Sequence, residues 1–272
     1  MSYIIKNLGY RTDFIFNKLD GTLEDRGDYL VATTTSNPNY FWGNFLFFKR
    51  PPKKGDFFKW KSLFEMELSD PRIYHMAFGW DSFDANEADY KEFVENGFEF
   101  HQDIVLSSSD FIRPKQYNEK IEVRVIDLNE YLPRCVEIQV ASATKDMSKK
   151  TWQEFYTKSM KKYLSLIEKG HGKWFGAFVN DVLVGSLGIF KSGDTARFQL
   201  VNTHPDFQRQ GVCSTLMYES CLYAMSKMNA SELVIVAEEN YHAVKIYQTV
   251  GFKEVQKQLG LCWWDKTKTN EA

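Results

Sequence analysis

The sequence predicts an α/β (α+β) protein in which helices flank a mixed, mostly antiparallel sheet. Three observations support this. Residues 197–228 change from a strand pattern to a helical pattern across a short loop. Residues 173–190 have the pattern of a β-hairpin, and the first half of the chain repeats the order of elements found at the end of the second half. The 272 residues are enough for one large domain or two small ones.

The first half of the chain predicts alternating strands and helices. The first residues, up to about position 28, are polar and mixed in composition, and they predict no regular element. The expected elements are strands at 29–35 and 41–48, a helix at 56–68, a strand at 72–80, a helix at 85–95 and a strand at 97–107. The polar segment 107–115, which contains Pro114, is the expected linker.

The second half predicts a strand and two helices, followed by a sheet that a further helix interrupts. The expected elements are a strand at 121–126, helices at 128–140 and 149–168, strands at 173–179 and 182–190, a strand at 197–203, a helix at 213–228, a strand at 232–237, a helix starting at Asn240 and two strands within 252–264. Asn180 and Asp181 are typical of a tight hairpin turn.

The transition at 201–217 predicts a binding site for phosphate. Cys213, Met217, Cys221, Ala224 and Met228 recur at helical spacing and indicate one apolar helix face. A strand that feeds through a loop directly into a helix leaves several backbone N–H groups free at the positive end of the helix dipole. Gly211 allows a positive φ or a close approach there, and Arg209 adds positive charge.

Two blocks of this region resemble a known family. The pattern Gln208-x-x-Gly211-x-Cys213 resembles the Q/R-x-x-G-x-G/A acyl-CoA loop of the GNAT acyltransferase superfamily. Residues 240–252, a helix ending in Gly251 and Phe252, resemble the second block of that family. Cys213 stands where the family prefers Gly or Ala, and because Cys is small and apolar we expect a tighter loop. The resemblance covers about 120–264 and implies the acyl-CoA N-acyltransferase fold.

The first half is interpreted as a degenerate GNAT-like copy. When Gly97 and Phe98 are aligned on Gly251 and Phe252, the neighbouring helices and strands also correspond. The loop at 51–56 has two prolines, which lack amide donors, and it lacks the spaced Gln and small residue. Phe93 takes the place of Tyr247. We therefore expect a degenerate GNAT-like N-terminal domain at 1–112 and a catalytic GNAT acetyltransferase domain at 118–265.

The resemblance implies roles for particular residues. Tyr247 is the expected catalytic residue and would act on the leaving thiolate. The residues expected to bind acetyl-CoA, the cosubstrate, are Val201, Asn202, Thr203, Gln208, Arg209, Gln210, Gly211, Val212, Cys213, Ser214 and Asn240. In the family the central strand is bulged, and an unpaired amide there faces the thioester oxygen.

No residue is assigned as the general base. Gln199 and Asn202 lie on the central strand where family members often have a Glu, and neither accepts a proton at neutral pH. His204, Glu137, Glu154 and an ordered water remain open alternatives. No residue is assigned to a metal.

Composition and charge limit the class of protein. A net charge of −2 and a pI of about 6.2 give no indication of a nucleic-acid partner or of an anionic membrane surface. The four cysteines have no paired spacing, no signal peptide is evident and no apolar run approaches the ~20 residues of a membrane helix, so a cytoplasmic protein is expected.

The expected function is an N-acetyltransferase that acts by direct attack of a primary amine in a ternary complex. Its partners are acetyl-CoA and an unidentified small amine or peptide acceptor, and the oligomeric state stays open. The alternatives are a non-catalytic acyl-CoA-binding regulatory module and a tandem-domain aminoacyl or peptidyl transferase.

Overall fold

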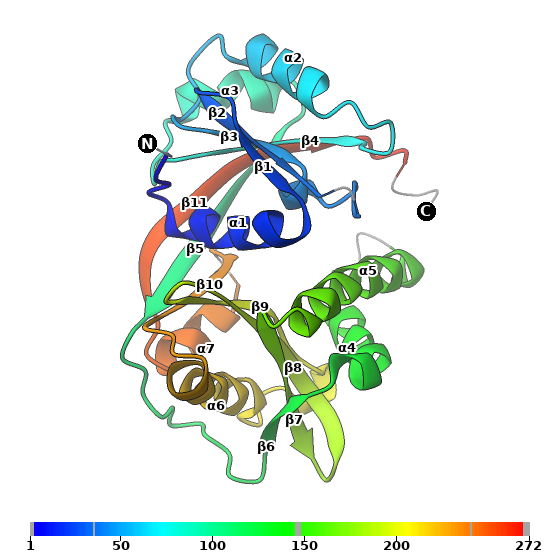
Figure 1. Cartoon of the computed structure of the whole chain (residues 1–272), viewed down its shortest axis with the longest axis vertical. Helices are drawn as coiled ribbons and strands as arrows, with labels where there is room; N and C mark the ends of the chain where they lie inside the picture. The colour runs from blue at the N-terminus through cyan, green and yellow to red at the C-terminus, as the bar shows by residue number, and fades with distance from the viewer. Residues whose placement is uncertain (1–2, 35, 145–147, 240, 269–272) are drawn as a thin grey trace. The chain divides into compact units, whose positions relative to one another are not determined.

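The computed structural model describes residues 3–34, 36–144, 148–239 and 241–268, and these form two compact units (Figure 1). Unit 1 comprises Met1–Val105 and Val255–Ala272, and unit 2 comprises Leu106–Glu254. The end of the chain returns to unit 1, where β11 (Lys253–Trp264) pairs antiparallel with β4 (His75–Trp80).

Unit 1 is a sheet with helices, and its strands run in the order β1-β2-β3-β4-β11-β5. Its elements are α1 (Leu8–Asp20), β1 (Thr22–Asp25), β2 (Tyr29–Thr33), the short 3-10 helix η1 (Phe41–Gly43), β3 (Phe45–Phe48), α2 (Phe57–Glu67), β4, α3 (Glu87–Glu95), β5 (Glu99–Ser108) and most of β11. Strands β1, β2 and β3 pair antiparallel, whereas β3 and β4 pair parallel.

Helix α1 was not expected from the sequence. Its buried residues fall mainly in two runs, Leu8–Tyr10 and Phe14–Asn17, and they include the polar Thr12 and Asn17. The helix starts because Asn7 accepts a hydrogen bond from the Tyr10 amide at 3.1 Å. The Asp81 carboxylate accepts the amides of Lys6 and Asn7 and so fixes the chain just before the helix.

The core of unit 1 is largely aromatic. Phe48 and Trp60 stack with their ring centroids 3.6 Å apart and their planes within 2°. Phe78 and Phe93 pack edge to face beside them and are fully buried. Such pairs add to the free energy of apolar burial, so the aromatic content of the first half is used to fill this core.

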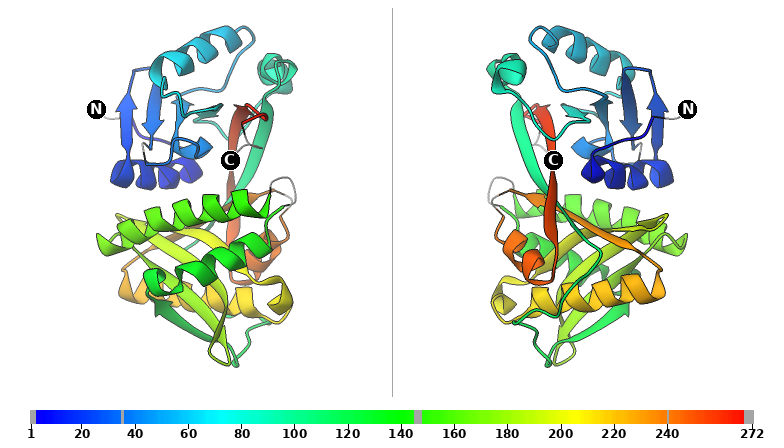
Figure 2. Two further views of the ribbon diagram at one scale, coloured as in Figure 1. Left: turned by 90° about the vertical axis from the view of Figure 1, so that its right-hand side faces the viewer. Right: turned by 90° about the vertical axis from the view of Figure 1, so that its left-hand side faces the viewer.

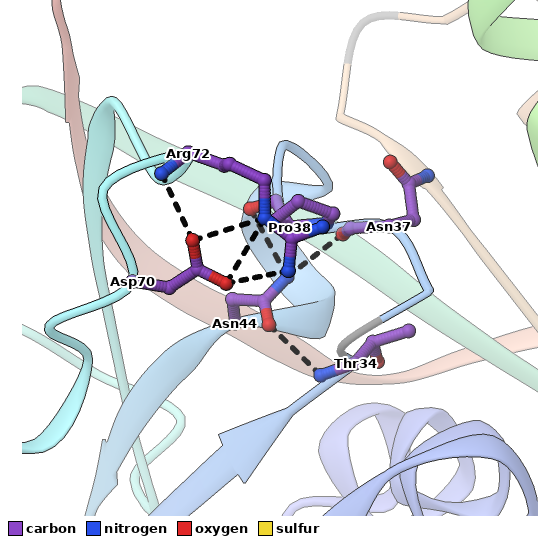
Figure 3. Close-up of polar contacts among 6 residues, drawn as sticks. All are labelled: Thr34, Asn37, Pro38, Asn44, Asp70 and Arg72. Atoms are coloured by element: carbon purple, nitrogen blue, oxygen red, sulfur yellow. Dashed lines mark hydrogen bonds and ion pairs between the residues drawn. The ribbon is translucent and has the colours of Figure 1, made fainter.

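A single buried side chain organises the loop before β3. Asn44, which is 2% exposed, accepts the Thr34 amide and donates to the carbonyl oxygens of Asn37 and Pro38 (Figure 3). It also donates to the carbonyl oxygen of Tyr40. An amide supplies both donors and an acceptor, so Asn44 satisfies several backbone groups of an irregular segment at once. Figure 3 also shows the exposed ion pair between Asp70 and Arg72, at 2.7 Å.

Unit 2 has helices on both faces of its sheet, with α4 and α5 on one face and α6 on the other (Figure 2). Its strands run in the order β10-β9-β8-β7-β6. Its elements are β6 (Glu122–Ile126), α4 (Leu128–Ala141), α5 (Lys149–Glu168), β7 (Gly172–Val179), β8 (Val182–Ser192), β9 (Thr195–Thr203), the 3-10 helix η2 (Pro205–Phe207), α6 (Val212–Lys227), β10 (Glu232–Glu238) and α7 (Ala243–Thr249). The hairpin turn between β7 and β8 has Asn180 and Asp181 at positive φ, as the sequence predicted.

Candidate active site

Strands β9 and β10 separate part of the way along the sheet of unit 2. They pair in parallel at only three positions, the last of which joins Val234 to Arg197. Strand β9 continues to Thr203 and β10 to Glu238, but in the described part of the chain no further residues of the two strands are in register. One edge of β9 therefore has free backbone groups that an extended ligand can pair with, as an added strand does.

Strand β9 is also bulged at the same place. Its register with β8 shifts between Ser186, which faces Asn202, and Gly188, which faces Gln199. Two residues of β9, Leu200 and Val201, therefore stand opposite one residue of β8. Leu200 has φ +49°, a backbone conformation that costs a residue with a side chain about 1–2 kcal/mol.

A relay of three hydrogen bonds holds this bulge. The Nε2 group of Gln139, on α4, donates to the Leu200 carbonyl at 2.7 Å. Asn202 donates to Gln139 Oε1 at 3.1 Å, and its own oxygen accepts the Thr203 amide at 2.8 Å. At about 1 kcal/mol for each hydrogen bond, the two bonds of Gln139 are large enough to offset the strain at Leu200.

The loop after β9 leads to the N-terminus of α6. Gly211 is the N-cap residue and has φ +79°, and as a glycine it gives no side-chain acceptor to the first amides of the helix. The N–H groups of Val212, Cys213 and Ser214 in the first turn therefore point out of the helix, at the positive end of its dipole. This arrangement suits the negative charge of a phosphate.

Segment 116–118 lies directly behind this loop. A Cβ atom on Gly211 would lie 2.2 Å from the Gln116 carbonyl oxygen, so only glycine fits. Asn118 donates from its side chain to the Gln210 carbonyl at 2.9 Å, and its amide donates to Thr215 Oγ1 at 2.9 Å. The loop thus has a fixed shape before any ligand is present.

A cavity of about 430 Å³ joins the open edge of β9 to the N-terminus of α6. The expected residues that line it are Val201, Asn202, Thr203, Gln208, Arg209, Gly211, Val212, Cys213, Ser214 and Tyr247. Thr203 Oγ1 is buried and has no partner among the described residues, so a polar group of a ligand can satisfy it.

Tyr247 is 3% exposed and projects from α7 into this cavity. Its hydroxyl makes no hydrogen bond with any residue that the structure describes. Burial, together with the nearby Cys213 and Tyr241, raises the pKa of Tyr247 well above its ordinary value of 10.0. The hydroxyl therefore keeps its proton and is available as a donor.

Two expected residues are not placed in the cavity, and several others line it that the sequence did not indicate. Gln210 is exposed, and its side chain donates to the Asp206 carbonyl. Asn240 lies outside the described residues. The additional lining residues are Gln116, Phe207, Tyr241, His242, Ala243, Lys245, Ile246 and Thr249. Ile246 and Tyr247 follow Ala243 by three and four residues and so lie on the same face of α7, which means that helical periodicity could have identified Ala243 and Ile246. No local sequence pattern indicates Gln116.

The base candidates have different surroundings. Glu137 borders a second cavity of about 390 Å³, which His204 also lines. The Arg134 guanidinium, 2.8 Å away, holds the pKa of Glu137 below its ordinary value, which weakens it as a base. Gln199 accepts a hydrogen bond from the Tyr163 hydroxyl at 3.4 Å. The assignment of a base stays open.

The corresponding place in unit 1 is closed. Strands β3 and β4 stay paired to the ends of both strands, at Phe48 and Trp80. In the loop before α2, the Asp56 carboxylate accepts the Lys53 amide at 2.8 Å, and Glu92 accepts the Gly55 amide at 3.2 Å. Side chains of the protein thus already occupy amides that a phosphate would need.

Comparison with known proteins supports this description. Residues 139–260 match the family model of the acetyltransferase (GNAT) domain. A conserved protein of unknown function from Staphylococcus epidermidis has a similar structure, with a TM-score of 0.74 and 15% identity over 93% of this chain and 97% of that one. A GCN5-related N-acetyltransferase from Kribbella flavida has a TM-score of 0.66 and 11% identity, over 94% of this chain and 96% of that one. A tandem GNAT protein from the clavulanic acid biosynthesis pathway has a TM-score of 0.57 and 10% identity, over 96% of this chain and 89% of that one. A comparison with curated proteins gave no match.

Residues 139–260 are therefore similar to the acetyltransferase (GNAT) domain, and the chain has the fold of the solved GNAT structures. The expected acyl-CoA N-acyltransferase fold is confirmed, and the similarity over nearly the whole chain to a tandem GNAT protein is consistent with a tandem arrangement. In the part of the chain that the structure describes, no helix is long and apolar enough to span a membrane.

Proposed function

We propose that unit 2 is an acetyl-CoA-dependent N-acetyltransferase that transfers the acetyl group to a primary amine by direct attack in a ternary complex. The observation that carries this proposal is the continuous cavity between the open, bulged edge of β9 and the N-terminus of α6. A CoA thioester needs both features together: an extended edge for its pantetheine arm and a group of amides for its pyrophosphate.

The residues of this chain fit acetyl-CoA as a substrate. The amides of 208–214 would hold the pyrophosphate, with Arg209 and Lys245 supplying positive charge. Val201 and Thr203 would pair with the amides of the pantetheine arm. The main-chain amide of Val201, at the bulge, would donate to the thioester oxygen as negative charge develops there.

Direct attack is favoured over a covalent acyl-enzyme. Cys213 is the cysteine that lines the cavity, and burial raises the pKa of its thiol to about 12. The thiolate is the nucleophilic form, so the raised pKa disfavours Cys213 as a nucleophile at neutral pH. The neutral amine would therefore attack the thioester carbon itself, and the C–S bond would break as Tyr247 donates a hydrogen bond to the leaving sulfur. CoA would leave as the thiolate, and the proton lost by the amine nitrogen would pass to water.

We also propose that residues 1–112 are a degenerate GNAT-like copy without a CoA site and that residues 118–265 are the catalytic domain. The paired strands β3 and β4, the loop amides that Asp56 and Glu92 already bind, and the buried ring of Phe93 support this. A cytoplasmic location is part of the proposal, and the four free cysteines agree with a reducing compartment.

The test is release of CoA thiol from acetyl-CoA with a panel of primary amines, beside calorimetric binding of acetyl-CoA. Turnover with at least one amine supports the proposal. Tight binding of acetyl-CoA without turnover on any amine would identify a regulatory binding module instead. Failure to bind acetyl-CoA would leave the aminoacyl or peptidyl transferase, which transfers from a different donor.

A further inference from the structure

Gln139 makes contacts that link a helix to the bulged strand. It lies on α4, two residues from the end of that helix, and is 4% exposed. Its amide donates to the carbonyl of Leu200 at 2.7 Å and accepts from the side chain of Asn202 at 3.1 Å. Because a carbonyl oxygen only accepts, the Gln139 nitrogen must face the Leu200 carbonyl, and the Gln139 oxygen then faces the side chain of Asn202.

These contacts act on the backbone of β9 at Leu200. Leu200 has a positive φ, which a leucine adopts only where its surroundings hold it. The carbonyl that Gln139 holds belongs to the peptide unit whose N–H group is that of Val201. Holding the oxygen therefore also sets the direction of the Val201 amide, and Val201 lines the cavity.

We propose that Gln139 is a positioning residue, which holds the bulge of β9 so that the Val201 amide points at the thioester oxygen. This inference rests on the proposed acetyl transfer. It states that a side chain on α4, Gln139, sets the direction of the Val201 amide on β9, which would bind the thioester oxygen. Gln139 is not among the residues that line the cavity, so its loss should lower the rate of transfer and leave the binding of CoA unchanged.

The first variant is Gln139→Met, which keeps the length of the side chain and removes both hydrogen bonds. We expect kcat for acetyl transfer to fall at least tenfold, while the Kd for CoA stays within twofold of that of the wild-type protein. Ile138→Val is the matched control, because it shortens the neighbouring buried side chain and leaves the three hydrogen bonds intact. A fall in kcat no larger than that of the control overturns the proposal.

The second variant is Gln139→Glu, which separates a hydrogen bond from packing. A protonated carboxyl can donate to the Leu200 carbonyl and accept from Asn202, as the amide does, whereas a carboxylate cannot donate. Burial raises the pKa of the introduced carboxyl above its usual value of about 4.3. The rate of this variant relative to wild type should therefore rise as the pH falls.

Dividing by the wild-type rate cancels the titration of the groups common to both proteins. Among these groups are the acceptor amine and the residues Glu137, Lys149 and His204, which line the second cavity beside α4. A ratio that is the same at every pH counts against a hydrogen-bonding role for residue 139.

A third measurement does not depend on activity. Hydrogen exchange of the amides at 199–203, followed by NMR without substrate, should be at least tenfold faster in Gln139→Met than in Ile138→Val. If the wild-type protein transfers no acetyl group, the proposed function fails, and faster exchange still shows that Gln139 holds the bulge. If transfer occurs but neither exchange nor kcat depends on Gln139, this inference alone is wrong.

Discussion

Replacing Tyr247 with Phe removes one hydroxyl group from the cavity and keeps the buried aromatic ring on α7. The hydroxyl makes no hydrogen bond with the described residues, so its removal leaves no partner unpaired, and the melting temperature should change little. The Kd for acetyl-CoA should also stay close to the wild-type value, because the expected contact is with the sulfur as it leaves.

The size of the effect follows from the state of the phenol. A free thiol has a pKa of about 8.5 and a phenol of about 10, so full proton transfer to the thiolate is uphill by about 2 kcal/mol with ordinary values. Burial raises the pKa of Tyr247 further, which makes complete transfer still less favourable. We therefore expect a hydrogen bond to the developing thiolate and a loss of about 10²-fold in rate, or about 2.7 kcal/mol.

The assay is a single-turnover measurement with saturating acetyl-CoA and a competent amine. Tyr218→Phe is the matched control, since Tyr218 lies on α6 outside the cavity and packs against Phe111 and Tyr117. An unchanged rate constant in Tyr247→Phe would refute the reasoning and leave Tyr247 as a packing residue.

Three further predictions concern binding and stability. Calorimetry should give one acetyl-CoA per chain, and a stoichiometry of two would contradict the closed site in unit 1. Gly211→Ala should weaken acetyl-CoA binding at least tenfold, because the new Cβ would lie 2.2 Å from the Gln116 carbonyl oxygen. The control is Gly170→Ala, at a similar φ of +83° with no atom near the new Cβ, which should leave the affinity for acetyl-CoA unchanged. Burial lowers the pKa of His75 to about 4 from 6.5, so the unfolded state takes up its proton first as the pH falls. The free energy of unfolding should then decrease by up to about 3 kcal/mol as the pH falls from 6.5 to 4. Denaturant unfolding measures this change: it should be missing in His75→Gln and present in the control variant His171→Gln.

The features that the sequence predicted well are those that local chemistry decides. Gly211 has the positive φ that its place in the loop implied, and Asn180 and Asp181 form the expected turn. The helix after the loop was expected at 213–228 and is found at Val212–Lys227, because apolar periodicity defines it within a few residues. The bulge that the family resemblance implied is present at Leu200 and Val201.

The features that the sequence did not predict depend on residues far apart in the chain. The start of helix α1 is held by Asp81, some seventy positions later. Gln116 was placed next to a polar linker, yet its carbonyl oxygen is what excludes a side chain at Gly211. Gln139 had no feature to distinguish it on α4, since only the fold brings it to Leu200.

The two units also show why a shared order of elements does not give a shared site. In both, three antiparallel strands lead through a loop and a helix to a parallel strand and a second helix. In unit 1 the parallel strands remain paired to their ends, and the Asp56 and Glu92 carboxylates already accept amides of the loop before α2. In unit 2 the strained Leu200 and its contact with Gln139 displace the end of β9 from a regular register, and the first amides of α6 have no side-chain acceptor at Gly211. Binding capacity therefore follows from hydrogen bonds that unit 1 completes internally and unit 2 leaves open.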